Sequence, residues 1–162
     1  IRGNLRDRLI VELFLATGLR CGELVSLTVT DLELSERKGL VTVRRAKGNK
    51  TRCVPLNIRA RTLLQEYIVA YAPTDRLFIG QRGALTPVAI NKLLKVYGAK
   101  ADIDNLHPHR LRHTMAFAYI QANPSDLVGL SQLLGHHDTH ITARYCLNRM
   151  EDLETKIEKL SY

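Results

Sequence analysis

The sequence lacks the features of an anchored, secreted or disulfide-stabilised protein. No apolar run approaches the roughly 18 residues that a membrane-spanning helix needs. The amphipathic start has no small-residue cleavage site, which a signal peptide would require. There are three cysteines without CxxC spacing, which disfavours a disulfide framework or a zinc ribbon and favours a reducing cytosol. We therefore expect a cytoplasmic protein with no membrane contact.

Motifs for nucleotide-dependent or metal-dependent chemistry are also missing. The chain has no G-x-x-x-x-G-K-[ST] loop and no acidic cluster of the kind that two-metal nucleases use. We therefore expect no cofactor and no metal. The 162 residues suffice for one domain with a real core. Because the chain begins with Ile rather than Met, we interpret it as a fragment of a longer protein.

Acidic residues are absent from one long stretch, and the charge that is present there is positive. The net charge is +8 with a pI near 9.7, and residues 37–61 contain nine Lys or Arg and no Asp or Glu. Such a stretch repels itself unless an anion lies against it, so we predict a polyanionic partner, most often nucleic acid. A merely soluble basic protein is the alternative. The side chains expected to contact such a partner are Arg44, Arg45, Lys50, Arg52 and Arg110.

Local patterns predict a mainly α-helical domain with one small antiparallel β-hairpin, an α+β fold. Alternating β-branched residues predict strands over 40–46 and 51–56, joined by a basic turn. The segment 72–86 is a connection with room for a short strand. In the helix over 58–71, the side chains expected to point inward are Leu63, Leu64, Tyr67, Ile68 and Tyr71. Periodicity, caps and breakers predict further helices over 5–17, 21–27, 87–97, 108–122, 127–134, 140–148 and 150–162.

The stretch "HPHRLRH" at 107–113 crowds cationic groups onto one predicted helix. His109, Arg112 and His113 lie at i, i+3 and i+4 and therefore share a face. A solvated basic face is one interpretation, and a zinc site completed by the histidines of "GHHDTH" at 135–140 is another. The guanidiniums disfavour a bound cation and instead match phosphate, which accepts bidentate hydrogen bonds.

Two further stretches carry similar chemistry. In "ATGLRCGELVSL", Arg20 follows a helix-ending glycine at the mouth of the next helix, where an anion can bind. The alternative is a surface arginine paired with Glu23. In "LLGHHDTHITARY", His136 follows a helix stop, and Tyr145 comes nine residues later on a predicted short helix.

These stretches, together with "RRAKGNKTRCVPL", occur in an order and spacing that resembles the catalytic domain of tyrosine recombinases, the phage integrase family. The resemblance runs from Ala16 to Tyr145. It implies the fold of that domain and a site-specific DNA strand transferase, which binds double-stranded DNA and is therefore associated with the nucleoid. Such an enzyme cuts and rejoins DNA through a covalent 3′-phosphotyrosine, without ATP or metal, and takes part in DNA recombination and integration.

The resemblance also implies roles for individual positions. The residues that it makes catalytic are Arg20, Lys47, His109, Arg112, His136 and Tyr145, and those that it makes supporting are Glu23 and His113. Tyr145 would be the nucleophile, and the hairpin lysine would protonate the leaving oxygen. Lys50 lies three positions after Lys47 and stays a rival for that role.

The ends depart from the family pattern, because the usual N-terminal core-binding domain is absent. We therefore interpret residues 1–162 as a single catalytic domain. The tail, 150–162, carries an apolar stripe formed by Met150, Leu153, Ile157 and Leu160. The resemblance suggests that this helix docks on a neighbouring protomer of a homotetramer on DNA, and folding back onto its own domain is the alternative.

Two rival classes remain open on the sequence alone. A type IB topoisomerase-like enzyme uses similar residues as a monomer, and a helix-turn-helix regulator binds DNA without cutting it. The "AKGNK" and "LLGH" elements favour the recombinase. Tyr145 discriminates against the regulator, since a protein that only binds DNA has no need of that tyrosine.

Overall fold

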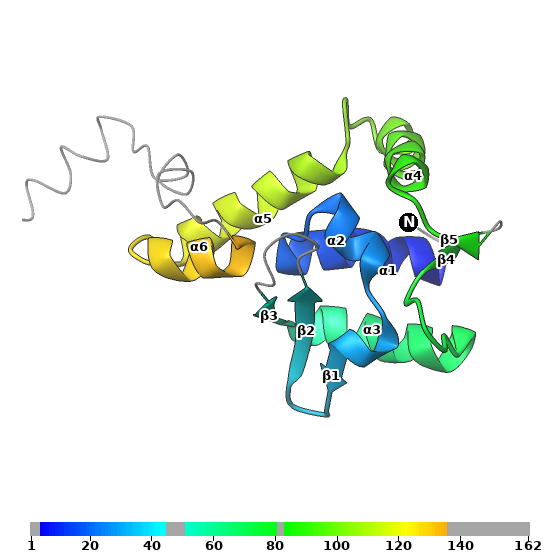
Figure 1. The fold of residues 1–162 in the computed structure, drawn as a ribbon. Coiled ribbons are helices and arrows are strands. Elements are labelled where there is room, and N and C mark those ends of the chain that lie inside the picture. The colour runs from blue at the N-terminus through cyan, green and yellow to red at the C-terminus, as the bar shows by residue number, and fades with distance from the viewer. Residues whose placement is uncertain (1–3, 45–50, 81–82, 136–162) are drawn as a thin grey trace, which may run out of the picture.

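A computed structural model describes residues 4–44, 51–80 and 83–135 of the chain (Figure 1). The helices in these ranges are α1 (Leu5–Thr17), α2 (Cys21–Ser26), α3 (Ile58–Tyr71), α4 (Pro87–Lys100), α5 (Pro108–Ala122) and α6 (Leu127–Leu134), with a 3-10 turn at Val29–Asp31. The strands are β1 (Leu32–Leu34), β2 (Gly39–Arg44), β3 (Thr51–Pro55), β4 (Ile79–Gly80) and β5 (Gly83–Ala84). The expected α+β fold, mainly helical with small antiparallel sheets, is confirmed.

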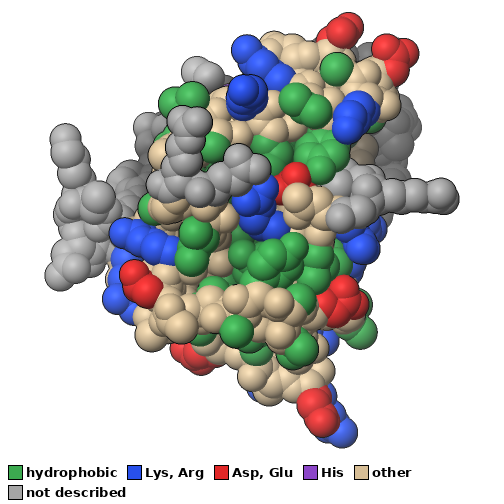
Figure 2. Space-filling model, turned by 90° about the vertical axis from the view of Figure 1, so that its right-hand side faces the viewer, with side chains coloured by type: hydrophobic (Ala, Val, Ile, Leu, Met, Phe, Trp, Pro, Cys, Tyr) green, Lys and Arg blue, Asp and Glu red, His purple; other side chains and the backbone are tan. Residues whose placement is uncertain are grey.

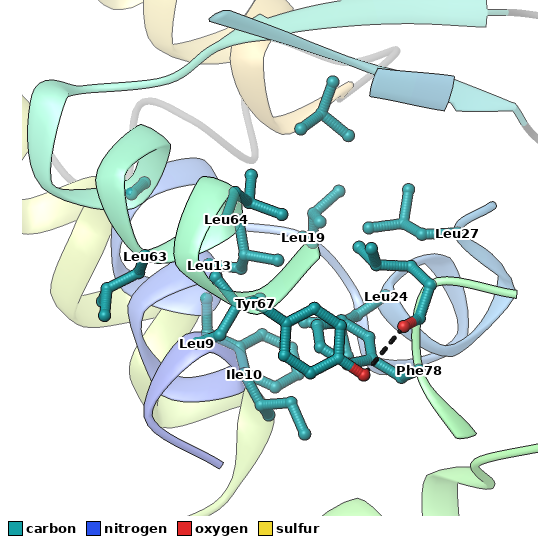
Figure 3. Close-up of a cluster of buried hydrophobic side chains, with 14 of the residues drawn as sticks. Leu9, Ile10, Leu13, Leu19, Leu24, Leu27, Leu63, Leu64, Tyr67 and Phe78 are labelled. Carbon is teal, nitrogen blue, oxygen red and sulfur yellow. Dashed lines mark hydrogen bonds between the residues drawn. The ribbon is translucent and has the colours of Figure 1, made fainter. Parts of the chain in front are cut away.

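Helix α1 lies in the middle of the fold, with α3 on one side and α5 on the other (Figure 1). Leu9, Ile10, Leu13 and Phe14 of this helix are fully buried, and Leu5 and Ala16 nearer its ends are partly buried. Figure 3 shows this core, in which the Tyr67 hydroxyl donates to the Leu77 carbonyl oxygen at 3.0 Å. The side chains labelled there are Leu9, Ile10, Leu13, Leu19, Leu24, Leu27, Leu63, Leu64, Tyr67 and Phe78.

The predicted hairpin is present and belongs to a larger sheet. Strand β2 pairs antiparallel with β3, with Val41 opposite Val54 and Val43 opposite Arg52. Val41, Val43 and Val54 are buried, so the alternating apolar residues of the sequence form the face of the sheet that points into the core. Strand β1, which the sequence did not predict, pairs with β2 to give the order β1-β2-β3. The turn over 45–50 lies outside the described residues.

Helix boundaries follow the expected caps. Gly18 ends α1 with φ 62°, and Gly135 ends α6 with φ 61°, a conformation that suits glycine. The Thr86 hydroxyl accepts from the Ala89 amide at the start of α4. Helix α4 runs to Lys100, beyond the predicted end near Tyr97. The predicted helices over 140–148 and 150–162 lie outside the described residues.

Two expectations for residues 58–86 were incomplete or wrong. Tyr71 was expected to point inward but is 52% exposed, because the last turn of α3 extends past the core. Its ring instead stacks on Tyr67, with ring centroids 4.6 Å apart. The connection that follows holds a two-stranded sheet, β4 with β5, rather than a single short strand.

Figure 2 views the side of the molecule that carries α4, β4 and β5. Hydrophobic side chains reach the surface near the middle of this face, and Lys and Arg side chains lie at several separate places around it (Figure 2). The positive charge is therefore not gathered into one patch on this side. Among the described residues, none of the helices has the length and apolar character needed to cross a bilayer.

Candidate active site

A hollow of about 370 Å³ lies where the start of α2, α4 and the start of α5 meet. Its lining is formed by Leu19, Arg20, Cys21, Asn91, His107, Pro108, His109 and Arg112. Three residues predicted as catalytic, Arg20, His109 and Arg112, are thus brought together from distant parts of the chain. No acidic side chain is among these lining residues, so the hollow suits an anion.

Arg112 is held in place by the ends of two helices. It is 4% exposed, and its guanidinium donates to the carbonyl oxygen of Gly18, after α1, and to that of Leu134 at 2.8 Å, at the end of α6. A helix C-terminus carries partial negative charge, so both partners stabilise the buried cation. The orientation of this guanidinium is therefore fixed by the fold before any ligand binds.

Arg20 is held by an acid that it shares with a second arginine. The Glu23 carboxylate accepts from the Arg20 amide at 2.8 Å and from the Arg20 guanidinium at 3.2 Å. The same carboxylate accepts two hydrogen bonds from Arg52, each at 2.8 Å. The predicted pairing of Arg20 with Glu23 is present, and it leaves the Arg20 side chain 43% exposed.

The electrostatics of Glu23 reflect these partners. Burial by itself raises the pKa of the Glu23 carboxyl. Hydrogen bonds from the Arg52 side chain and the Arg20 backbone, together with the charges of both arginines, outweigh burial and lower the pKa to about 2. Glu23 is therefore ionised throughout the neutral range and offsets part of the positive charge beside the hollow.

The histidines of "HPHRLRH" form a row at the start of α5. His107 is the N-cap residue, and its ring lies 6.3 Å from that of His109. The His109 and His113 rings meet edge to face, 4.2 Å apart. Burial, followed by the charges of His109, Arg112 and His107, lowers the pKa of His113 below its usual value. The expectation that His109, Arg112 and His113 share one face is met in part: the exposed rings of His109 and His113 lie side by side, whereas Arg112 is buried and lines the hollow together with His109.

The residues expected to contact DNA have different surroundings. Arg44 is 66% exposed and pairs with Asp31 at 2.9 Å, and Arg110 is exposed and donates to the Asp104 carbonyl oxygen. Arg52, in contrast, has a side chain that is only 12% exposed. Its expected contact with DNA stays a prediction, whereas the structure shows a link between α2, β3 and α6.

Several expected site residues lie outside the described residues. They are Arg45, Lys47, Lys50, His136 and Tyr145. The rivalry between Lys47 and Lys50 therefore remains open, as does the zinc interpretation that used the histidines of 135–140. Within the described ranges, no group of three His, Cys, Asp or Glu side chains has the arrangement of a metal site.

Sequence reasoning missed three contributions to the hollow and its support. His107 and Asn91 both line it. The position of His107 two residues before His109 was an available signal, whereas nothing local indicates that α4 brings Asn91 there. The Arg52–Glu23 pair joins residues 29 positions apart, and no short-range pattern encodes it.

Comparison with known proteins agrees with this geometry. The model of the phage integrase family matches residues 2–152, and the chain belongs to that family. Tyrosine recombinase XerC of Pseudomonas fluorescens is 40% identical over 145 residues, which is 86% of this chain and 47% of that protein. XerC of Pseudomonas aeruginosa is 41% identical over 145 residues, or 86% of this chain and 46% of that protein.

Solved structures give the same result for the fold. The XerH site-specific recombinase, in a pre-cleavage complex with its difH substrate, superposes with a TM-score of 0.83 at 26% identity, over 98% of this chain and 49% of that one. XerA recombinase gives a TM-score of 0.82 at 29% identity, over 98% of this chain and 59% of that one. The chain spans about half the length of the curated relatives it matches.

Proposed function

We propose that this chain is the catalytic domain of a site-specific tyrosine recombinase that cuts and rejoins double-stranded DNA through a covalent 3′-phosphotyrosine. The observation that carries the proposal is the hollow that holds Arg20, His109 and Arg112 together without an acidic lining. Two guanidiniums can each fork onto the non-bridging oxygens of one phosphate. They neutralise the charge that develops in the transition state, and neither ATP nor metal is needed.

The reaction conserves bonds and protons. The Tyr145 oxygen attacks phosphorus in line, a phosphorus–oxygen bond to tyrosine forms, and the bond to the 5′ oxygen breaks. The phenol has an ordinary pKa near 10, so it must lose its proton to a base or be ionised by cationic surroundings. His109 is the candidate to take that proton or to bind the phosphate, and Lys47 the candidate to protonate the 5′ oxygen.

The covalent product retains the energy of the phosphodiester. Another 5′ hydroxyl can therefore attack the phosphotyrosine and rejoin a strand. We propose that the complete protein does so as a homotetramer on DNA, with residues 150–162 docked on a neighbouring protomer. The relatives that support this assignment act, by their names, as tyrosine recombinases, and XerH was captured both before and after cleavage of its DNA substrate.

The experiment that tests the proposal uses suicide duplexes, nicked so that the cleaved strand diffuses away. A pool built from the sequences that flank the parent gene is incubated with the protein in EDTA, and adducts are counted on denaturing gels. We expect an adduct whose peptide maps to Tyr145. Tyr145→Phe abolishes the adduct and leaves DNA affinity within about twofold, whereas Tyr71→Phe on α3 retains it.

Each negative result has a definite meaning. Binding without an adduct, from both this chain and the longer parent protein, would support a regulator that only binds DNA. An adduct from the parent protein alone would show that the segment outside this chain is required to hold the duplex. Relaxation of supercoiled DNA by a monomer, without strand exchange, would support the topoisomerase-like alternative.

A further inference from the structure

We propose that Arg52 is a positioning residue, which fixes Arg20 and the C-terminal end of α6 in the geometry required for strand cleavage. This inference rests on the proposed function for its catalytic consequence. The structural coupling itself is independent of that function. Arg52 lies on β3 and binds Glu23 on α2 and the Leu133 carbonyl oxygen on α6, so one side chain connects three elements of the fold.

The contacts of Arg52 use the planar shape of its guanidinium. Two of its nitrogens donate to the two oxygens of Glu23 at 2.8 Å each, and Nε donates to the Leu133 carbonyl oxygen at 2.8 Å. The Arg52 and Glu23 side chains are only 12% and 10% exposed. A lysine ammonium is a point donor and cannot make this forked pair and the third bond together. The chemistry therefore requires arginine and not merely positive charge.

Glu23 transmits the position of Arg52 to Arg20. One carboxylate oxygen accepts from the Arg52 and Arg20 side chains, at 2.8 and 3.2 Å, and the other accepts from the Arg52 side chain and the Arg20 amide, at 2.8 Å each. The carboxylate is thus oriented mainly by its less exposed partner. Without Arg52 the Glu23 carboxylate would be free to rotate toward Arg20 or toward water. The Arg20 guanidinium, which it binds, would then change its position at the hollow.

Arg52 also holds the end of α6, where Arg112 binds too. Arg52 donates to the Leu133 carbonyl oxygen and Arg112 to the Leu134 carbonyl oxygen, so two arginines from different elements bind successive residues. A Cβ atom on Gly135 would lie 3.0 Å from a guanidinium nitrogen of Arg52. The α6 end lies beside β3 in Figure 1. His136, predicted to be catalytic, is the next residue in the sequence.

The burial of Arg52 distinguishes this role from direct DNA contact. A side chain that binds a DNA phosphate displaces counterions from the DNA. Its removal therefore reduces the slope of log affinity against log salt concentration by about one. A positioning residue leaves that dependence unchanged and lowers the rate of the chemical step. Displacement of a catalytic group by about 1 Å can cost on the order of 100-fold in rate.

The test compares Arg52→Met and Arg52→Lys with Arg59→Met in the otherwise unchanged protein. Arg59 is the matched control, since it also pairs with a buried acid, Glu12 at 2.9 Å, but lies on α3 away from the hollow. Adduct formation is measured in a single turnover at saturating suicide duplex, and affinity is measured across salt concentrations. We expect Arg52→Met to lower the rate about 100-fold, Arg52→Lys to lower it at least tenfold, and Arg59→Met to leave it within twofold.

The pH dependence of the rate of adduct formation provides a second measurement, which general damage to the fold would not change in the same way. In the native protein Glu23 stays ionised in mild acid, so it adds no acidic limb to the rate between pH 4 and 6. In Arg52→Met the pKa of Glu23 rises, and the rate falls as Glu23 takes up a proton. The double variant with Glu23→Gln loses this limb. Weaker binding with a smaller salt slope and an unchanged saturated rate would instead make Arg52 a DNA contact and overturn the proposal.

Hydrogen exchange tests the coupling without any DNA chemistry. The Gly135 amide donates to the Gln132 carbonyl oxygen at 3.1 Å, at the helix end that Arg52 holds. We expect its exchange rate to rise at least tenfold in Arg52→Met and Arg52→Lys but not in Arg59→Met. Unchanged exchange would overturn the proposed positioning. If exchange changes as expected while even the native protein forms no adduct, the proposed function fails and the structural coupling stands.

Discussion

The Nε2 atoms of His109 and His113 lie 2.7 Å apart on successive turns of α5. A hydrogen bond at this distance needs one nitrogen that carries a proton and one that does not. The two rings therefore cannot both be fully protonated while they keep this contact. His109 lines the hollow, so its partner His113 influences which tautomer it presents there.

The first prediction concerns His113 and the stability of the fold. Because burial and the neighbouring positive charges lower the pKa of His113, the unfolded chain binds its proton more tightly than the folded chain does. The free energy of unfolding should thus decrease as pH falls below the unfolded value of about 6.5. His113→Gln should flatten this decrease, measured by urea unfolding between pH 8 and pH 5. Parallel pH curves for the two proteins would contradict it.

The second prediction concerns Glu23 and acid. Its pKa is about 2 in the fold against an ordinary value of 4.5, so its stabilising effect is complete above pH 4.5 and is lost as pH falls toward 2. Glu23→Gln should cost roughly 3 kcal/mol at neutral pH, and the difference from the native protein should shrink in acid. Glu33→Gln, on an exposed position of β1, serves as the control and should change little. A difference that is constant with pH would argue against the role of ionised Glu23.

The third prediction uses two nearby glycines. Gly18 has φ 62°, and a Cβ there would lie 2.8 Å from Leu134 Cδ2 and 3.1 Å from Met115 Sδ. Gly18→Ala should therefore destabilise the fold by about 1–3 kcal/mol. Gly22 lies in α2 with nothing within 4 Å of its Cβ position, so Gly22→Ala should be neutral or stabilise by up to about 1 kcal/mol. Thermal unfolding of both variants measures the contrast, and equal effects would contradict it.

The fourth prediction separates two stacked tyrosines. Tyr67 is 3% exposed and donates to the Leu77 carbonyl oxygen, whereas the neighbouring Tyr71 is 52% exposed. Tyr67→Phe leaves that buried carbonyl oxygen without this donor and should lower the free energy of unfolding by about 1–2 kcal/mol. Tyr71→Phe should alter it by less than about 0.5 kcal/mol. Chemical denaturation monitored by circular dichroism gives both values.

Local signals in the sequence predicted most of the described helices, because caps such as Thr86 and stops such as Gly18 act on their immediate neighbours. Strand β1 escaped prediction, since three residues, Leu-Glu-Leu, become a strand only through pairing with β2. Tyr71 fitted the helical spacing of buried residues, and only the end of the core decides that it is exposed. A local sequence pattern does not determine where the helices and strands that pack against α3 end.

The candidate site was partly predictable for the same reason. Short motifs identified Arg20, His109 and Arg112, and the family resemblance suggested that they act together. The approach of Asn91 on α4 and the pairing of Arg52 with Glu23 depend on tertiary packing, which no motif records. Sequence reasoning assigned Arg52 to DNA because its neighbours are basic, and only its depth in the fold shows its internal partners.

The bond from Arg112 to the Gly18 carbonyl oxygen joins residues 94 positions apart, and that from Arg52 to Leu133 joins residues 81 apart. Contacts of such long sequence separation require large loop closures, which slow folding. A ribosome-bound chain that ends before α6 lacks Leu133, the partner of Arg52, and Leu134, a partner of Arg112, although it contains both Arg112 and Gly18. The full set of hydrogen bonds that holds the Arg52 and Arg112 guanidiniums therefore forms only when the chain is folded from α1 through α6.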